Sequence, residues 1–448
     1  MTTYRLWSGL RTIGGNIVEV RTEQARVLCD FGLSVSADVP ESEQTQSELE
    51  NFLQAKRLPA IPELFPTDDF EKIELAGFEE ATLETALFIS HLHLDHMGAL
   101  RFLPEGVHVY LSEDSLKLFH LLVEVGEEDP VRCQLHSYKP EETIQVGDIT
   151  VTPHLSDHDA LGTTAFFIES DDLKLIHSGD FRFNGNYPER VTEWAEKARD
   201  WHPDVLLIEG TSYSFDDDEE GDEEVLEETE TTLEEQVEMD PLSEETLLDA
   251  VADTVNTHAS DLVVFNPYIR NVERLAFVEE VVTERGRTMV WEEPYAYVLS
   301  GFYPERTWTV LEETKTGKLD DSLIDQSLSL DAIKETPGDY VLQNSYKNLS
   351  YLDGFTQGVY IHSNGEPLGD YDPRYQEMLE QLEQFGLTFL SLGASGHANR
   401  DEIIEVAKTV SAKYTLPWHS FKPESLHAAL FENGIESFVP ELNKEYRA

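Results

Sequence analysis

Three histidines and an aspartate stand within six positions of the stretch "SHLHLDHMG", residues 90–98. They are His91, His93, Asp95 and His96, in a chain with only 15 histidines among 448 residues. Imidazole and carboxylate groups together suit zinc or a similar transition metal. The preceding run "ALFIS" is apolar and typical of a strand, so we expect these side chains where a strand enters a loop. The alternative is an exposed polar loop that has an excess of histidine by chance.

Further ligand-type residues follow other apolar runs. His154 and His158 occur in "HLSDHDALG", Asp180 in "LIHSGDF" and His419 in "LPWHSF". Each is a weak signal alone, because a single histidine after a strand is more often an ordinary loop residue. Together with the first group they supply enough ligands for two metal ions that share a bridging carboxylate. The residues alone leave open whether His154 or His158 is a ligand.

The elements that must position these side chains can be read from the apolar pattern. Short apolar runs such as "GNIVEV", "TTAFFIES" and "DVLLIEG" predict strands through the first 210 residues, and stretches 113–125 and 188–200 predict helices. This mixture indicates sheets covered by helices. Residues 246–286 predict helix, strand and helix, an α/β unit with a parallel sheet. "LTFLSLGASGHANRDEI" predicts a strand, a loop and a helix.

Segment 216–245 is dominated by acidic residues and breaks the apolar pattern. We interpret it as an exposed insertion or linker that marks a boundary. The expected organisation is a first domain over residues 1–212, an inserted domain over 213–385, and a return to the first domain over 386–448.

The overall charge is strongly negative. Asp and Glu total 89 against 32 Lys and Arg, a formal net charge of -57. Such a surface repels itself unless salt screens it, so we expect a halophilic, archaeal cytoplasm. Two cysteines, Cys29 and Cys133, suggest no disulfide framework. The first residues do not resemble a secretory signal, and no apolar run is long enough to predict a membrane span.

On these motifs the chain resembles the metallo-β-lactamase fold. "HLHLDH" matches its HxHxDH signature, and "LCDFG" with Asp30 looks like its first motif. The resemblance implies an αββα sandwich, with Asp180 bridging two zinc ions and Asp30 supporting the ligands from behind. His158 looks like the third motif, because Gly162 and the apolar run after it keep the family's spacing, although "HDALG" replaces the usual His-Ser-x-Pro. The resemblance assigns one ion to His91, His93 and His158 and the other to Asp95, His96 and His419.

A second resemblance concerns the β-CASP nucleases of this fold. "LLIEGTSY" with Glu209, "GASGHANRDEI" with His397, and His419 look like their motifs A, B and C. The arrangement is similar to ribonuclease J, with a β-CASP domain inserted between Glu209 and His397. After His419 the usual Gly-Glu is replaced by Ser420 and Phe421.

Several residues could contact a phosphate. Ser395 and Gly396 precede a predicted helix, whose N-terminus attracts anions. His397 could donate a proton to the leaving oxygen; its alternative is a helix-capping loop residue. Phosphate contacts are predicted for Arg270, Arg274 and Arg182, and surface ion pairs with the abundant acids are the alternative for the arginines.

The sequence therefore predicts a cytoplasmic two-metal phosphodiesterase that acts on single-stranded RNA. Manganese could replace zinc, and a homodimer is expected because dimers are common among similar nucleases. The alternative is a metallo-β-lactamase-fold hydrolase of a small ester, thioester or lactone. Whether RNA is cut internally or from an end is left open.

Overall fold

The computed structural model describes residues 1–34, 44–215, 242–369 and 372–447. The predicted acidic segment lies outside these ranges except for its last residues, 242–245, where a helix begins at Glu244.

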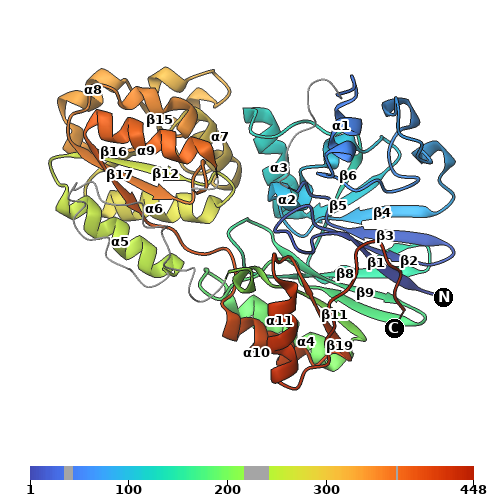
Figure 1. Ribbon diagram of the computed structural model, residues 1–448. Coiled ribbons are helices and arrows are strands. Elements are labelled where there is room, and N and C mark those ends of the chain that lie inside the picture. Colours follow the sequence, from blue (N-terminus) through green and yellow to red (C-terminus); the bar gives the residue numbers. More distant parts are fainter. Residues whose placement is uncertain (35–43, 216–241, 370–371, 448) are drawn as a thin grey trace, which may run out of the picture.

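Two six-stranded sheets are stacked in the first lobe (Figure 1). The first sheet has the order β1-β2-β3-β4-β5-β6, and the second has the order β19-β11-β10-β9-β8-β7. The strands of the first sheet are β1 (Thr3–Ser8), β2 (Ile17–Arg21), β3 (Ala25–Cys29), β4 (Glu84–Phe88), β5 (His108–Ser112) and β6 (Gln134–Tyr138). Those of the second are β7 (Ile144–Val146), β8 (Ile149–Leu155), β9 (Thr164–Ser170), β10 (Leu173–His177), β11 (Val205–Glu209) and β19 (Tyr414–Trp418).

Helices cover the outer face of each sheet. The first sheet packs against α1 (Glu48–Gln54) and α3 (Glu113–Val125), and α2 (Leu94–Met97) lies at its edge. The second packs against α4 (Pro188–Trp201), α10 (Arg400–Val410) and α11 (Pro423–Glu432). The predicted αββα sandwich is therefore confirmed.

Strand β11 shows why the sequence forms this sandwich. All five of its residues are buried. Leu207 faces the core between the sheets, whereas Leu206 and Ile208 face the core under the helices. Because successive side chains of a strand point to opposite faces, a strand buried on both sides reads as an uninterrupted apolar run. The run ends at Glu209, whose side chain belongs to the site described below.

The second lobe is built on a five-stranded parallel sheet of order β13-β16-β12-β17-β18. Its strands are β12 (Leu262–Pro267), β13 (Thr288–Val290), β16 (Tyr340–Gln343), β17 (Gly358–Ser363) and β18 (Leu387–Ser391). The other elements of this lobe are α5 (Glu244–Thr257), α6 (Val272–Glu284), α7 (Glu293–Phe302), β14 (Trp308–Leu311), β15 (Ile324–Leu328), α8 (Leu330–Glu335) and α9 (Pro373–Phe385). The predicted helix, strand and helix of residues 246–286 correspond to α5, β12 and α6.

The expected boundary after residue 385 is wrong by one strand. β18 pairs with β17 in the sheet of the second lobe, so the chain returns to the sandwich only after Ser391. The error has a physical reason, since the apolar pattern of a strand does not say which of two sheets the strand will join.

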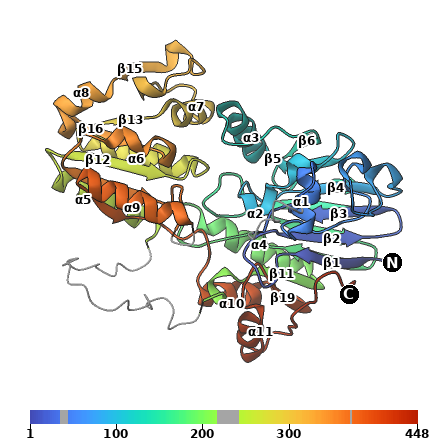
Figure 2. The same cartoon turned by 45° about the horizontal axis from the view of Figure 1, so that its top comes forward.

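The two lobes touch through helices as well as through the chain connections. Helix α3 of the sandwich packs against α7 of the second lobe, and Figures 1 and 2 both show the two helices side by side. A Cβ atom on Gly301 would collide with the Leu121 side chain. Glycine at this position therefore lets the two helices come close together.

Candidate metal centre

The first group of ligand-type side chains consists of three histidines. His91 and His93 follow β4, and His158 follows β8. One ring nitrogen of each lies within 4.8 Å of the others, and His93 Nδ1 is 3.1 Å from His158 Nε2. Three imidazoles whose nitrogen atoms converge in this way could hold a metal ion.

The second group combines two aspartates with two histidines. Asp95 and His96 stand on α2, Asp180 follows β10, and His419 follows β19. His96 Nε2 is 3.1 Å from Asp180 Oδ2, and His419 Nε2 is 3.0 Å from Asp95 Oδ2. Asp180 Oδ2 also lies 3.8 Å from His91 Nε2 of the first group. This carboxylate therefore stands between the two groups, where it could bridge two ions.

Unpaired polar atoms show that these residues fit metal ions. His91 Nε2, His93 Nε2 and Asp180 Oδ1 are buried atoms without a hydrogen-bond partner among the described residues. Burying a polar atom without a partner is costly. Metal ions at these positions would satisfy all three atoms, and nitrogen and oxygen donors of this kind suit zinc or manganese.

The protonation of two members of the cluster, His91 and Asp180, matches a ligand role, whereas the carboxylates of Asp180, Asp95 and Asp30 raise the pKa of His96 despite its burial. Burial and the neighbouring imidazoles hold the pKa of His91 well below its usual range, so this ring is neutral, as a ligand must be. Burial alone would raise the pKa of Asp180, but His419 and His96 hold it well below the usual value. The aspartate is therefore ionised and can accept a cation.

Asp30 supports the cluster from behind. Its Oδ1 accepts a hydrogen bond from Ser90 N at 2.7 Å, and its Oδ2 lies 2.8 Å from His96 Nδ1. The aspartate is completely buried. Because a carboxylate on one ring nitrogen directs the other nitrogen outward, Asp30 points His96 Nε2 at Asp180, the supporting position predicted for it.

His158, and not His154, lies beside the other ligand-type side chains. His154 is still part of β8, and its ring packs on Phe167 with 4.2 Å between ring centroids. The alternation of side chains along β8 turns His154 toward the helix-covered face.

Three further side chains contact the cluster and were not singled out in the sequence. Asp159 Oδ1 lies 3.2 Å from both His93 Nε2 and His158 Nε2. Asn16 Nδ2 is 3.3 Å from Asp95 Oδ2. Thr211 Oγ1 is 2.7 Å from His419 Nδ1. Asp159 directly follows His158, and Thr211 closely follows Glu209, so their proximity to motif residues could have identified them from the sequence. No sequence feature points to Asn16.

Glu209 and His397 form a pair next to the second group. His397 Nδ1 is 3.0 Å from Glu209 Oε2 and 3.9 Å from Asp180 Oδ2. Burial would lower the pKa of His397, but the carboxylates of Glu209, Asp180 and Asp159 raise it to about 9. The sandwich supplies Glu209, and the loop that returns from the second lobe supplies His397.

The loop around His397 differs from the sequence expectation. Ser395 and Gly396 do not stand at a helix N-terminus, because α10 begins only at Arg400. Its capping residue is Asn399, whose side chain accepts a hydrogen bond from Glu402 N. Asn399 and Glu402 form a capping box, a signature that is present in the sequence and that fixes the later start.

Gly396 has a packing role instead. Its carbonyl oxygen contacts His158 Nδ1, and a Cβ atom on Gly396 would lie 2.8 Å from His158 Cε1. A residue without a side chain therefore lets the loop press against a ligand ring and orient it.

Arg182 and Arg274 are buried and paired, which corrects the prediction that they contact phosphate. Both bind Glu244 Oε1, with their Nη2 atoms at 2.9 and 2.7 Å. The ion pairs that were the alternative are present, but inside the protein. The many acidic residues in the sequence suggested that the arginines would form ion pairs. The sequence does not show that one buried carboxylate, that of Glu244, binds both guanidinium groups.

The same two arginines reach the loop of His397. Arg182 Nη1 donates to the Ser395 carbonyl at 3.3 Å. Arg274 Nη1 donates to Asn364 Oδ1 at 2.6 Å, and that oxygen also accepts from Ala394 N at 3.2 Å. The ion-pair cluster of Glu244, Arg182 and Arg274 therefore fixes the loop.

Arg270 links the second lobe to the metal motif. It pairs with Glu128 Oε2 at 2.5 Å, and its Nε donates to the carbonyl of Leu92, which lies between His91 and His93, at 2.7 Å. The predicted phosphate contact of Arg270 is not supported, because its guanidinium group already binds Glu128 and the Leu92 carbonyl of the sandwich.

The chain is similar to known proteins over different lengths. Residues 78–256 match the family described as beta-lactamase superfamily domain, a region that runs from β4 into α5 and contains the ligand-type side chains of the first two groups except His419. The chain carries a metallo-β-lactamase fold. The metallo-β-lactamase fold implies divalent metal binding and supports a metal-dependent hydrolase.

Individual proteins give more distant likenesses. Endoribonuclease ysh1 of Schizosaccharomyces pombe (strain 972 / ATCC 24843) is 27% identical over 159 residues, 31% of this chain and 20% of that protein. The match thus spans only a fifth of that curated relative. A crystal structure of a protein of unknown function from Enterococcus faecalis V583 covers 100% of both chains, at 27% identity and a TM-score of 0.83. The metallo-beta-lactamase fold protein YhfI of Bacillus subtilis aligns over 47% of this chain and 72% of its own, at 14% identity and a TM-score of 0.29, too weak to support an argument.

Among the helices that the structure describes, none has the length and apolar character needed to cross a membrane.

Proposed function

We propose that the chain is a two-metal phosphodiesterase that hydrolyses single-stranded RNA, of the β-CASP type and similar to ribonuclease J. The metals would be two zinc ions, with manganese as the alternative. One ion would be held by His91, His93 and His158. The other would be held by Asp95, His96 and His419, and Asp180 would bind both ions.

The observation that carries the proposal is the pair of Glu209 and His397 beside Asp180. A hydrolase of small esters needs a metal centre but no histidine brought in by a separate lobe. Here the loop that leaves the second lobe places His397 3.9 Å from Asp180 Oδ2. The likeness to endoribonuclease ysh1 supports an RNA substrate.

Different residues of this chain would have different roles in the hydrolysis. Two divalent ions bound in the cluster lower the pKa of water and stabilise negative charge on a phosphate. Asp30, Asn16 and Thr211 hold the ligands in position through hydrogen bonds. His397, oriented by Glu209, can donate a hydrogen bond to the phosphate or a proton to the leaving oxygen.

The test is cleavage of 5′-labelled single-stranded RNA in molar salt with added zinc or manganese. Wild type is compared with Asp95→Ala and His397→Ala, and with His202→Ala, a change of an exposed histidine at the end of α4, as matched control. We expect cleavage by wild type and His202→Ala and its loss in the two site variants. The product ladder would show whether RNA is cut internally or from an end.

The same preparations are given single-stranded DNA, a thioester and a lactone. Hydrolysis of the thioester or lactone by a metal-loaded protein that leaves RNA intact would overturn the proposal and favour a small-ester hydrolase.

A further inference from the structure

A cavity of about 140 Å³ lies between the two lobes, next to the metal centre. Leu94, which lines it, stands between the ligands His93 and Asp95. Tyr268, another lining residue, has its ring centroid 5.4 Å from that of His93. Two residues of the cavity wall are therefore neighbours of the candidate metal centre, Leu94 in the sequence and Tyr268 in space.

The cavity is placed where parallel sheets bind ligands. Asn266 and Pro267 come from the carboxyl end of β12, and Glu366 follows β17. The chain leaves β12 toward β13 on one side of the sheet order, and it leaves β17 toward β18 on the other. Ligands of open α/β sheets bind at such a point, outside the carboxyl ends of two strands whose connections diverge.

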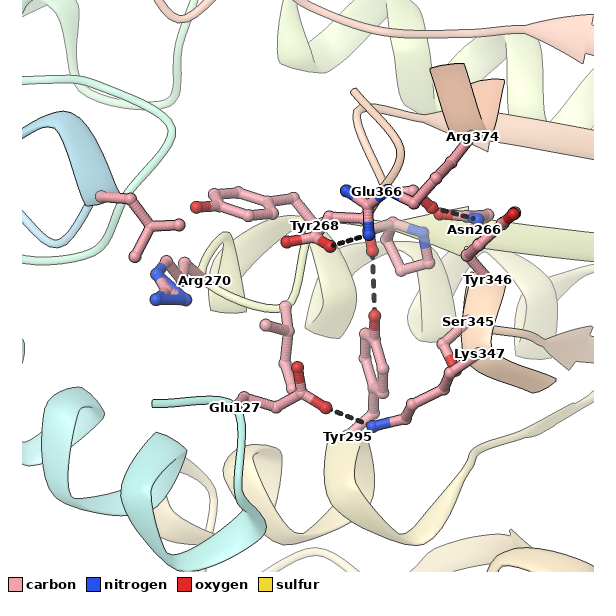
Figure 3. Close-up of a pocket in the computed structure, with 13 residues that line it drawn as sticks. Glu127, Asn266, Tyr268, Arg270, Tyr295, Ser345, Tyr346, Lys347, Glu366 and Arg374 are labelled. Atoms are coloured by element: carbon pink, nitrogen blue, oxygen red, sulfur yellow. Dashed lines mark hydrogen bonds and ion pairs between the residues drawn. The ribbon is translucent and has the colours of Figure 1, made fainter. Parts of the chain in front are cut away.

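The positive charges around the cavity are already neutralised. Lys347 pairs with Glu127 across the lobes, Arg270 pairs with Glu128, and Arg374 pairs with Asp372 and with Glu366. Figure 3 shows the pairs of Lys347 with Glu127 and of Arg374 with Glu366 on the wall. A phosphate would have to displace a carboxylate to bind here, so the lining does not favour an anion.

Aromatic rings are the other main feature of the wall. Tyr268, Tyr295 and Tyr346 line the cavity (Figure 3). The hydroxyl of Tyr295 donates to the Pro267 carbonyl at 3.2 Å, and that of Tyr346 to Glu377 at 3.0 Å. With these hydroxyl groups engaged, Tyr295 and Tyr346 offer mainly their rings. Asn266 and Ser345 also line the cavity, but Asn266 Nδ2 donates to the Glu366 carbonyl at 3.2 Å and the Ser345 hydroxyl donates to Glu292 Oε2 at 2.6 Å.

The volume sets a limit on the occupant. Pockets that enclose a whole small ligand usually measure roughly 300–1,000 Å³. At about 140 Å³ the cavity is smaller and suits one ring system that belongs to a longer substrate.

We infer that this cavity holds the nucleobase next to the scissile phosphate, and that it recognises the base by stacking on aromatic rings rather than by binding a phosphate. The inference rests on the proposed RNA hydrolysis. Stacking of a base on an aromatic side chain stabilises the bound strand and tolerates different bases. It also needs no counterion release, which contributes little at high salt.

The test combines substitutions in the cavity wall with the removal of one base from the substrate. The substrate is 5′-labelled oligoadenylate, either complete or with one internal ribose that carries no base but keeps its phosphates. The proteins are wild type, Tyr268→Leu, Tyr268→Phe, which keeps the ring, and Tyr346→Leu, a second wall variant. Tyr351→Leu, in the same 3₁₀ segment as Tyr346 but not in the cavity lining, is the matched control. Metal content and melting temperature are measured for each protein.

With wild type, Tyr268→Phe and Tyr351→Leu, we expect a bond beside the baseless ribose to be cut about tenfold less efficiently than in complete RNA. Tyr268→Leu should raise KM for complete RNA about tenfold at unchanged metal content, and Tyr346→Leu should raise it in the same direction. For Tyr268→Leu the missing base should cause little further loss, because base and ring act as a pair.

Other results would overturn the inference. If wild type cuts complete and baseless RNA equally well, or if Tyr268→Leu weakens both equally, the cavity does not hold a base, although RNA hydrolysis stands. If wild type loaded with metal cuts no RNA, the proposed function and this inference both fail.

Discussion

His397 is hydrogen-bonded to Glu209, and this pair is the most specific feature of the site at the residue scale. Glu209 is completely buried at the end of β11, and its carboxylate contacts His397 Nδ1 at 3.0 Å. Neither residue belongs to the group of His91, His93 and His158, but both converge with Asp180 and His419, with one donor atom of each within 4.8 Å of the others. The proposed ligand sets assign neither residue to an ion, so on that assignment their removal should impair the reaction without emptying the metal centre.

We predict that His397→Ala lowers kcat for RNA about 100-fold or more, the usual size of an acid–base contribution, while the metal content is unchanged. Glu209→Gln should lower kcat by a smaller factor, because the amide oxygen still accepts a hydrogen bond from His397. The measurement is steady-state kinetics together with metal analysis of the same samples. A loss of metal in His397→Ala would instead make this histidine a ligand.

At the scale of elements, connections that follow strands place the ligands. The loops or short helices after β4, β8, β10 and β19 carry them, and the ion-pair cluster of Glu244, Arg182 and Arg274 holds the returning loop. Glu244 is the first residue of α5 and is 2% exposed, whereas its neighbour Glu245 is exposed.

We predict that Glu244→Ala destabilises the protein by about 3–5 kcal/mol, because it removes the carboxylate of the buried Arg274 and leaves the buried Arg182 with Asp157 alone. Glu245→Ala, on the same helical turn, should change stability by less than about 0.5 kcal/mol. Denaturant unfolding in molar salt measures both. Equal stability of the two variants would show that the buried cluster contributes nothing.

The metal motif could be recognised from the sequence because it is local. His91, His93, Asp95 and His96 lie in one short connection, and strand periodicity around Asp180 and His419 marks where those strands end. Long-range pairing could not be read in the same way. No sequence pattern predicts that Arg274 binds Glu244 or that β18 pairs with β17, because these pairings depend on the packing of the whole lobe.

At the scale of the whole molecule, the formal net charge of -57 opposes the compact state. Arg182, Arg270 and Arg274 pair with carboxylates inside the protein, and the 32 Lys and Arg of the chain are too few to balance its 89 Asp and Glu. Screening by salt should replace the missing cations, because the Debye length falls to about 3 Å at 1 M ionic strength.

We therefore predict that the melting temperature rises by about 10 °C or more between 0.1 and 2 M potassium chloride. Glycerol at matched osmolality should give a smaller rise, since it does not screen charge. A melting temperature that is the same in both salt concentrations would contradict the expectation of a halophilic protein.

The most direct measurement for the central claim is the metal content and RNA cleavage of wild type and Asp180→Ala, determined on the same preparations in molar salt. Asp180 is the carboxylate that lies between the two ligand groups. We predict two metal ions per chain and RNA cleavage for wild type. Asp180→Ala should retain fewer ions and cut RNA at least about 100-fold more slowly. An Asp180→Ala protein that cuts RNA at the wild-type rate, or a wild type that binds two ions and leaves RNA intact, would contradict the account.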